Sequence, residues 1–330
     1  MIAQTLSTVV DWRESCLKRF GDFTLAYATR TDPMLEFFGD ASGYIAFRKF
    51  WGYIYVLGDP VASDEYSQKL IDRFLACYPS SMFCQITDRT AKLLHSIGYW
   101  VNEMGVDTVL DLKTYHFQGK QRASLRYSTN WLQSHGYRIE EMSIDTELRL
   151  QMQQVIEQWR TKRVNKREVV FLNRQAVLDD EEDVRKFVLF NPLGHLEAFV
   201  FFDPLYRDGE IIGYVTAIKR RIPQATPYAE MGICKWAIEQ FQSEGKEVLR
   251  LGLSPLASIE NRQYRHVRPM HYSWHYLHRA WWVNRFFYNF KGHAQFKRRF
   301  GGMEEKTYFA SPVFFNDLRI IGWLRMLRLI

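Results

Sequence analysis

A run of 40 residues towards the C-terminus, Asn261–Phe300, combines positive charge with aromatic rings. It contains nine Lys and Arg residues and no Asp or Glu. The whole chain has a formal charge of +7, so the remaining residues carry a small net negative charge and the basicity is local. Cations neutralise phosphates and aromatic rings stack on unpaired bases, so the composition favours a surface that binds a polyanion. A basic face over an aromatic core, or one that touches anionic lipid, has the same composition.

The stretch with the most side chains suited to phosphates is YNFKGHAQFKRRFGG. Its candidate substrate-binding groups are Lys291, His293, Arg298 and Arg299, which flank Lys297. A coenzyme A donor offers only a pyrophosphate and one further phosphate, which one helix N-terminus and its loop can hold. Nine basic residues exceed that need, so the run favours a nucleic acid.

A second basic cluster lies in FQGKQRASLRYSTN, which includes Lys120, Arg122 and Arg126. A turn at Gly119 is expected to lead into a helix, on which Arg122 and Arg126 share a face because they are four residues apart. Such a pair near a helix N-terminus suits phosphate binding. A solvated helix start is an equally good interpretation.

Three histidines, His271, His275 and His278, recur at the spacing of one helical face. A metal site is conceivable, but no carboxylate or cysteine lies near them in the sequence, so core or base-stacking roles are favoured. We therefore expect no metal and no cofactor. The sequence also has no GxSxG, Walker or dinucleotide-binding motif, so it gives no support to those enzyme classes.

The apolar periodicity predicts an α/β protein with two similar halves. Alternating residues predict strands in the first half, and an apolar stripe predicts a helix over 63–78. The second half repeats that order with different residues and includes a helix that Thr226 and Pro227 open. We expect a duplicated fold with modules at 1–140 and 141–330.

The hydrophobic content of 47% and the aromatic content of 16% are typical of a folded protein. The N-terminus lacks the features of a secretory signal, and no segment reaches the ~20 apolar residues of a membrane-spanning helix. We therefore expect a cytoplasmic protein that is peripheral at the inner face of the membrane.

The last 14 residues predict an amphipathic helix. Ile320, Trp323, Leu324 and Leu327 share one face, and arginines spread over the others. Such a helix can lie in the surface of a bilayer. Packing on the second module is an equally good interpretation.

Several phrases, in order, resemble the catalytic domain of the phosphatidylglycerol lysyltransferase family. They are VLGDP, LLHSIGY, NEMGVDTVLDL, FQGKQRASLRYSTN, DGEIIGYV, EGKEVLRLGLSPL and YNFKGHAQFKRRF. The resemblance spans roughly Leu25 to Tyr308. It covers the catalytic domain and not the multi-helix membrane (flippase) domain that precedes it in larger members. It implies a tandem GNAT-like acyltransferase fold, with two similar modules around a mixed twisted sheet, and transfer of an aminoacyl group from a charged tRNA to a membrane lipid hydroxyl.

The resemblance also implies a reactive site. Lys297 matches the Lys of the family's FKxKF phrase, with Arg299 in place of the second Lys, and would supply positive charge. The strand ending in GLSPL would splay from its neighbour, so that backbone N–H groups near Gly252 and the Ser254 hydroxyl could hold a tetrahedral oxyanion. Glu230 or a histidine is the candidate general base.

One phrase departs from the family pattern. AIKRR replaces DLMR after the long strand, which places Arg220 and Arg221 among the candidate substrate-binding residues and leaves the acceptor open. The expected partners are aminoacyl-tRNA and an anionic, phosphatidylglycerol-like lipid. The alternatives are an N-acyltransferase that uses acyl-CoA or acyl-carrier protein, and a non-catalytic module that binds RNA or anionic membrane. The sequence does not specify the transferred amino acid or the oligomeric state.

Overall fold

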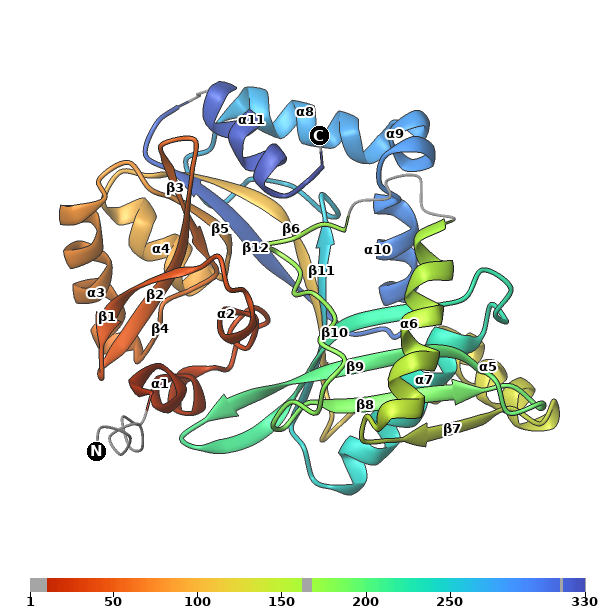
Figure 1. Cartoon of the computed structure of the whole chain (residues 1–330). Coiled ribbons are helices and arrows are strands. Elements are labelled where there is room, and N and C mark those ends of the chain that lie inside the picture. The colour runs from red at the N-terminus through yellow and green to blue at the C-terminus, as the bar shows by residue number, and fades with distance from the viewer. Residues whose placement is uncertain (1–10, 162–167, 315–316, 330) are drawn as a thin grey trace, which may run out of the picture.

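The computed structural model describes residues 11–161, 168–314 and 317–329. Its strands form one twisted sheet with helices on both faces (Figure 1). In chain order, the described elements are α1 (Trp12–Phe20), α2 (Ala28–Thr31), β1 (Glu36–Asp40), β2 (Gly43–Phe50), β3 (Tyr53–Leu57), β4 (Val61–Ala62), α3 (Asp64–Cys77), β5 (Met82–Ile86), α4 (Asp88–Ser96), β6 (Trp100–Asp111), α5 (Ala123–Ser134), β7 (Arg138–Glu141), α6 (Thr146–Thr161), β8 (Arg185–Phe190), β9 (Leu196–Arg207), β10 (Glu210–Arg221), α7 (Ala229–Ser243), β11 (Val248–Pro255), α8 (Arg268–Arg279), α9 (Trp281–Phe286), α10 (Phe290–Arg298), β12 (Met303–Ser311) and α11 (Asp317–Met326).

The sheet is mixed and continuous across both halves of the chain. Its order is β1-β2-β3-β5-β12-β6-β11-β10-β9-β8-β7, and β4 pairs with β2. The pairs β3·β5 and β10·β11 are parallel. The antiparallel pair β6·β11 joins the halves, and β12 from the C-terminal region lies between β5 and β6. The predicted mixed α/β sheet is confirmed. The module boundary at residue 140 stays a prediction, since one sheet contains the strands of both halves.

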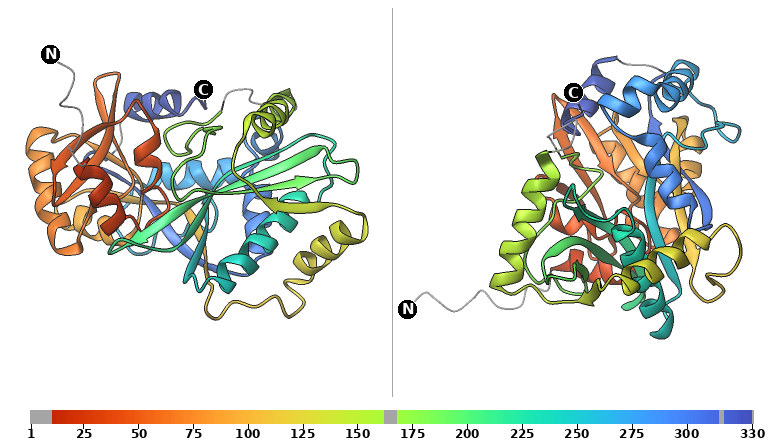
Figure 2. Two further views of the ribbon diagram at one scale, coloured as in Figure 1. Left: turned by 60° about the horizontal axis from the view of Figure 1, so that its bottom comes forward. Right: turned by 90° about the vertical axis from the view of Figure 1, so that its right-hand side faces the viewer.

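Helices cover the two faces of the sheet in separate groups (Figure 2). Residues of α3 and α4 share one core cluster with the first strands, and residues of α5 and α7 share another with β8, β9 and β10. A third and larger cluster contains residues of α1, α6, α8 and α11. The sheet is therefore buried on both faces, which explains why β9 is buried along nearly its whole length.

Local signals set the helix boundaries. The Ser63 side chain caps α3 by accepting a hydrogen bond from the backbone N–H of Tyr66 at 3.3 Å, as an N-cap residue should. The second-half helix α7 begins at Ala229, two residues after Pro227. It ends at Ser243, two residues before Gly245, whose φ of +73° favours glycine.

The C-terminal helix α11 packs on β2 and β3 from the first half of the chain and on β12, which belongs to residues 141–330. The Tyr55 hydroxyl on β3 donates to the Arg319 carbonyl at 2.8 Å. The Trp323 ring is buried against Phe309 of β12, with ring centroids 5.1 Å apart. The buried face of α11 therefore belongs to the core. Among the described helices, none combines the length and apolarity needed to cross a membrane.

This packing predicts a large stability difference between two positions on one helix. Trp323→Ala removes a 5% exposed ring and should lower the free energy of unfolding by about 3–5 kcal/mol. Ile321→Ala on the exposed side, where the residue is 40% exposed, should change it by less than about 0.5 kcal/mol. Urea unfolding followed by circular dichroism measures both. Equal shifts for the two variants would show that α11 is not anchored through its Trp323 face.

Candidate functional site

The parallel strands β10 and β11 pair over only three residues and then separate. Their register runs from Gly213–Val248 to Val215–Arg250, although both strands continue beyond it. On its other side, β11 pairs with β6 from Val248 to Pro255, with a shift in register between Arg250 and Leu253. The bulge contains Gly252, whose φ is +78°, a value that favours glycine. The predicted divergence of strands near Gly252 is confirmed.

A pocket of about 440 Å³ occupies the space between the separated strands. The strands contribute Thr216, Ala217, Lys219, Arg220, Arg221, Leu251, Gly252 and Leu253. The helix α10 and the turn before it contribute Tyr288, Asn289, Gly292, His293, Phe296 and Lys297. The rest of the wall is Trp159, Glu168, Val169, Asn173, Arg174 and Glu230. The pocket thus brings the end of the basic run to the splayed strands.

Lys297 lies at the base of this arrangement. Its side chain is buried, and Nζ donates hydrogen bonds to the carbonyls of Gly252 at 2.7 Å and Leu253 at 2.6 Å. Burial, and to a smaller extent the positive charge of the nearby Lys219, lower the pKa of Lys297 to about 7, although Asp107 opposes the shift. A neutral amine that donates both N–H groups to these carbonyls keeps its lone pair for another partner. Near neutral pH, Lys297 can therefore accept a proton as well as provide a charge.

A buried ionic group lies on the strands that flank this lysine, and sequence reasoning missed it. Asp107 of β6 accepts a hydrogen bond from the Thr24 hydroxyl and lies 3.6 Å from the guanidinium of Arg250. Arg250 also pairs with Glu305 of β12 at 2.7 Å. Burial raises the pKa of Asp107 while Arg250 opposes the rise. Asp107 lies within the phrase NEMGVDTVLDL. The alternation of residues along a strand predicts only whether a side chain faces the core or solvent, and it does not predict an ionic partner.

The end of β10 contributes three consecutive cations, one of which sequence reasoning did not single out. The Lys219 ammonium lies 4.4 Å from the centroid of the Phe296 ring and has no ion-pair partner among the described residues. Arg220 pairs with Glu168 at 3.2 Å, and Arg221 pairs with Glu230 at 3.5 Å. Of the three cations, Lys219 is thus the one that forms no ion pair with a carboxylate in the described part of the chain.

The predicted oxyanion and base residues differ in their positions. Gly252 lines the pocket, whereas Ser254 is buried and is not part of the pocket wall. Glu230 lines the pocket from the first turn of α7, where Arg221 holds its carboxylate. The catalytic roles of these residues stay predictions.

The remaining candidates of the basic stretch sit on the rim. His293 is exposed and stacks on Tyr288, with ring centroids 5.1 Å apart. The Lys291 ammonium donates to the Arg279 carbonyl at 3.2 Å. Arg299 lines a smaller pocket of about 250 Å³ that shares Glu230 with the main one.

The second basic cluster lies beside the end of α10. Arg122 donates to the carbonyl of Phe300 at 3.2 Å and to that of His116 at 2.6 Å. Arg126 donates to the carbonyls of Phe117 and of Gly119. Both guanidinium groups therefore fix the loop before α5.

Other basic residues in this region reach solvent. Lys120 and Arg299 are exposed, whereas the exposed Arg298 pairs with Glu304 at 3.0 Å. The two sequence clusters thus form one basic surface beside the pocket, on which Lys120 and Arg299 have no ion-pair partner among the described residues.

The three histidines do not gather around a common point. His271 exchanges a 2.8 Å hydrogen bond with the Asn261 amide and lies edge-on to His275, with ring centroids 4.5 Å apart. In the part of the chain that the structure describes, no group of three His, Cys, Asp or Glu residues could hold a metal ion.

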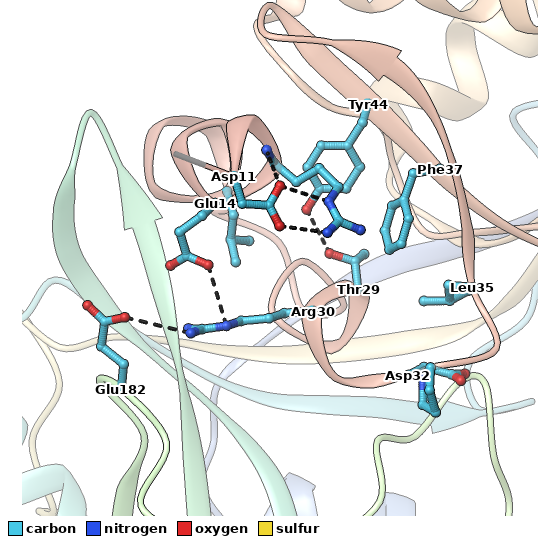
Figure 3. Close-up of a pocket in the computed structure, with 12 residues that line it drawn as sticks. Asp11, Glu14, Thr29, Arg30, Asp32, Leu35, Phe37, Tyr44 and Glu182 are labelled. Carbon is cyan, nitrogen blue, oxygen red and sulfur yellow. Dashed lines mark hydrogen bonds and ion pairs between the residues drawn. The ribbon is translucent and has the colours of Figure 1, made fainter. Parts of the chain in front are cut away.

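A second pocket of about 550 Å³ lies between α1, α2 and the β1–β2 pair (Figure 3). Its charges pair with one another: Arg13 with Asp11 at 2.6 Å, and Arg30 with Glu14 at 3.4 Å. The lining contains four carboxylates and only two guanidinium groups. Its negative excess disfavours a polyanionic substrate, so the pocket at the splayed strands is the better candidate site.

Comparisons with known proteins agree with this geometry. A family model described as "Phosphatidylglycerol lysyltransferase, C-terminal" matches residues 15–311. The phosphatidylglycerol lysyltransferase of Bacillus subtilis is 23% identical over 235 residues, which are 69% of this chain and 27% of that protein. The chain therefore spans about a quarter of the length of that curated relative.

Solved structures show the same fold. L-PGS from Bacillus licheniformis superposes with a TM-score of 0.75 at 22% identity, covering 96% of each chain. A C-terminal DUF2156 domain from Agrobacterium fabrum also gives 0.75, at 18% identity and with 96% of each chain covered. FemX gives 0.52 at 7% identity, covering 91% of this chain and 97% of that one. The expected GNAT-like fold is thus confirmed, and the chain belongs to the family of phosphatidylglycerol lysyltransferase C-terminal catalytic domains.

Proposed function

We propose that this protein transfers an aminoacyl group from a charged tRNA to the hydroxyl of an anionic, phosphatidylglycerol-like membrane lipid. The observation that supports this most directly is Lys297, a buried amine with a pKa of about 7 at the splayed strands. An amine with this pKa can exchange protons with reacting oxygen atoms at neutral pH. Family membership supports the choice of donor and acceptor.

The proposed reaction needs no cofactor. The lipid hydroxyl oxygen attacks the carbonyl carbon of the ester that joins the amino acid to the terminal ribose, and its proton passes to Nζ of Lys297. A tetrahedral oxyanion forms, and the Lys219 ammonium is a cation near enough to Lys297 to lower its pKa and to favour that negative charge. The ribose oxygen then leaves and takes the proton from Lys297. The bond to the lipid oxygen replaces the bond to the ribose oxygen, and Lys297 returns to its neutral state.

The basic surface beside the pocket would hold the tRNA end. Lys120 and Arg299 are exposed there, without an ion-pair partner among the described residues, so they are available for phosphates. Arg122 and Arg126 would act indirectly by fixing the loop between them. Arg220, Arg221, His293 and Lys291 would line or rim the entrance.

The donor can be tested directly. With purified protein, phosphatidylglycerol vesicles and a mixture of charged tRNAs, we expect an aminoacylated lipid that thin-layer chromatography and mass spectrometry detect. Ribonuclease treatment should abolish its formation. Product that survives ribonuclease and requires an acyl thioester would instead identify an acyl-CoA or acyl-carrier-protein N-acyltransferase. No product with either donor would favour a binding module.

The role of Lys297 predicts a pH dependence. If neutral Lys297 accepts the hydroxyl proton, kcat/KM should rise about tenfold per pH unit below its pKa of about 7 and level off above it. Lys219→Met removes the neighbouring positive charge, so it should raise the pKa of Lys297 and move the midpoint to higher pH. Initial rates between pH 6 and 8.5, corrected for spontaneous ester hydrolysis, measure both midpoints.

Two lysine variants control this experiment. Lys297→Met should lower kcat by about 10²–10⁴-fold, whereas Lys92→Met, on the exposed side of α4, should have a small effect. A rate that falls as pH rises through 7 would show that Lys297 acts as a fixed cation and not as a base.

The position of Arg299 predicts that its substitution changes tRNA affinity but not the rate of the chemical step. Arg299→Ala should weaken tRNA association and reduce the slope of log affinity against log salt by about one phosphate contact. The kcat at saturating tRNA should stay unchanged, since the arginine does not line the pocket that contains Lys297. Filter binding at several salt concentrations provides the slope. An unchanged slope would place the tRNA elsewhere.

A further inference from the structure

An exposed cluster of aromatic rings covers α9 and the end of α8. Tyr276, Trp281, Phe286 and Phe287 are 60%, 67%, 51% and 54% exposed, and Trp282 is 38% exposed. The rings form two contacting groups: Trp282 lies 5.7 Å from Phe287 and 6.4 Å from Tyr276 between centroids, and Trp281 lies 6.0 Å from Phe286. Large apolar side chains that meet on a surface mark an interaction site.

Buried residues fix the orientation of this cluster. Met270 and Trp274 of α8, and Val283 of α9, point into the protein, so the exposed rings lie on the outward side of the same helices. Trp274 packs on Phe309 of β12, the ring that also receives Trp323 of α11. The helices α8 and α11 therefore lie on the same face of the sheet, as the views also show (Figures 1 and 2). Leu318 and Ile321 of α11 are exposed as well.

The charge around the rings is positive. Arg279 and Arg285 are exposed within the cluster, and neither has an ion-pair partner among the residues that the structure describes. The surrounding 40-residue run contains no carboxylate side chain. Tyr and Trp side chains prefer the interface between lipid and water, and arginines beside them attract anionic headgroups.

The chain links this surface to the reactive pocket. Phe287 is followed directly by Tyr288, which lines that pocket and stacks on His293. A lipid whose headgroup lies at the aromatic surface is therefore next to the pocket rim.

We propose that the outward face of α8 and α9, with its five aromatic rings and two arginines, docks on an anionic lipid bilayer and presents lipid headgroups to the pocket of Lys297. This inference rests on the proposed function for the fate of the lipid, but the docking itself does not need the reaction. It divides the basic run into a membrane face on α8 and α9 and a tRNA face at the end of α10. The rings provide apolar area, and the arginines provide selectivity for anionic headgroups.

Vesicle sedimentation tests the docking with the full chain. We expect the protein to bind vesicles of 40% phosphatidylglycerol in phosphatidylcholine with about tenfold higher affinity than vesicles of phosphatidylcholine alone. This affinity should fall as the salt concentration rises. The double variant Trp281→Ser and Phe286→Ser should bind the anionic vesicles about tenfold less. The double variant Leu150→Ser and Leu193→Ser removes residues that are 56% and 81% exposed elsewhere, and it should bind as the original protein does. Circular dichroism and thermal unfolding confirm that each variant is folded.

A transfer assay separates this inference from the proposed function. The aromatic variant should transfer to a short-chain, water-soluble phosphatidylglycerol at the original rate and to vesicle lipid about tenfold more slowly. Lost vesicle binding without any transfer activity in the original protein would support the docking and reject the function. Equal vesicle binding by both double variants would overturn the docking. The docking would also be overturned if the aromatic variant lost tRNA affinity while its vesicle binding stayed unchanged. A dimer of the original protein that the aromatic substitutions dissociate would overturn it as well.

Discussion

The contact between the Lys297 ammonium and two carbonyls of β11 joins the C-terminal helices to the centre of the sheet. It exists only because β11 leaves β10 after Arg250. A continued parallel ladder would use those carbonyls for strand pairing and would close the pocket. The bulge at Gly252 aims them at the lysine, and its φ of +78° explains the glycine. A Cβ there would meet its nearest neighbours at 3.7 Å and 3.8 Å, so the backbone conformation, and not space, restricts this position.

The same contact sets the chemistry of the amine. Burying an ammonium group with two neutral carbonyls as partners favours loss of its proton, and Lys219 adds repulsion. Because its pKa when folded is about 7 and its ordinary value is 10.5, Lys297 contributes less to stability as pH falls from about 10.5 to about 7. Below both values, the cost of burying the charge is fully present. The fold thus maintains a destabilising group where proton transfer would occur, as is common at functional sites.

Sequence reasoning found what local patterns encode and what the family resemblance implies. The helix over 63–78 and the helix that Thr226 and Pro227 open follow from local patterns, whereas the divergence near Gly252 follows from the resemblance, and all three are confirmed. Lys219 was missed because alternation along a strand does not tell which side lines a pocket, particularly next to the register shift between Thr216 and Ile218. Contacts between segments that are distant in the sequence could not be predicted from it either.

Long-range pairing explains the other differences. Arg220 meets Glu168, 52 residues away in the sequence, and β12 enters the sheet between two strands of the first half. Arg122 and Arg126 have the spacing of a phosphate-binding pair, yet their guanidinium groups bind loop carbonyls. The spacing of residues predicts which side chains share a face of a helix. It cannot predict which distant groups the folded chain places next to those side chains.

The basic run illustrates how one composition can serve two surfaces. Along α8 and α9, the rings are exposed and meet one another, while the arginines among them lack carboxylate partners in the described structure. In α10 and just after it, the rings of Phe296 and Phe300 turn inward, and the cations surround the pocket. A bilayer needs exposed apolar area beside its charges, whereas a tRNA end needs cations around a recess. Exposure, which composition does not contain, therefore separates the two surfaces, and their junction at Tyr288 is where a lipid hydroxyl and a tRNA ester could meet.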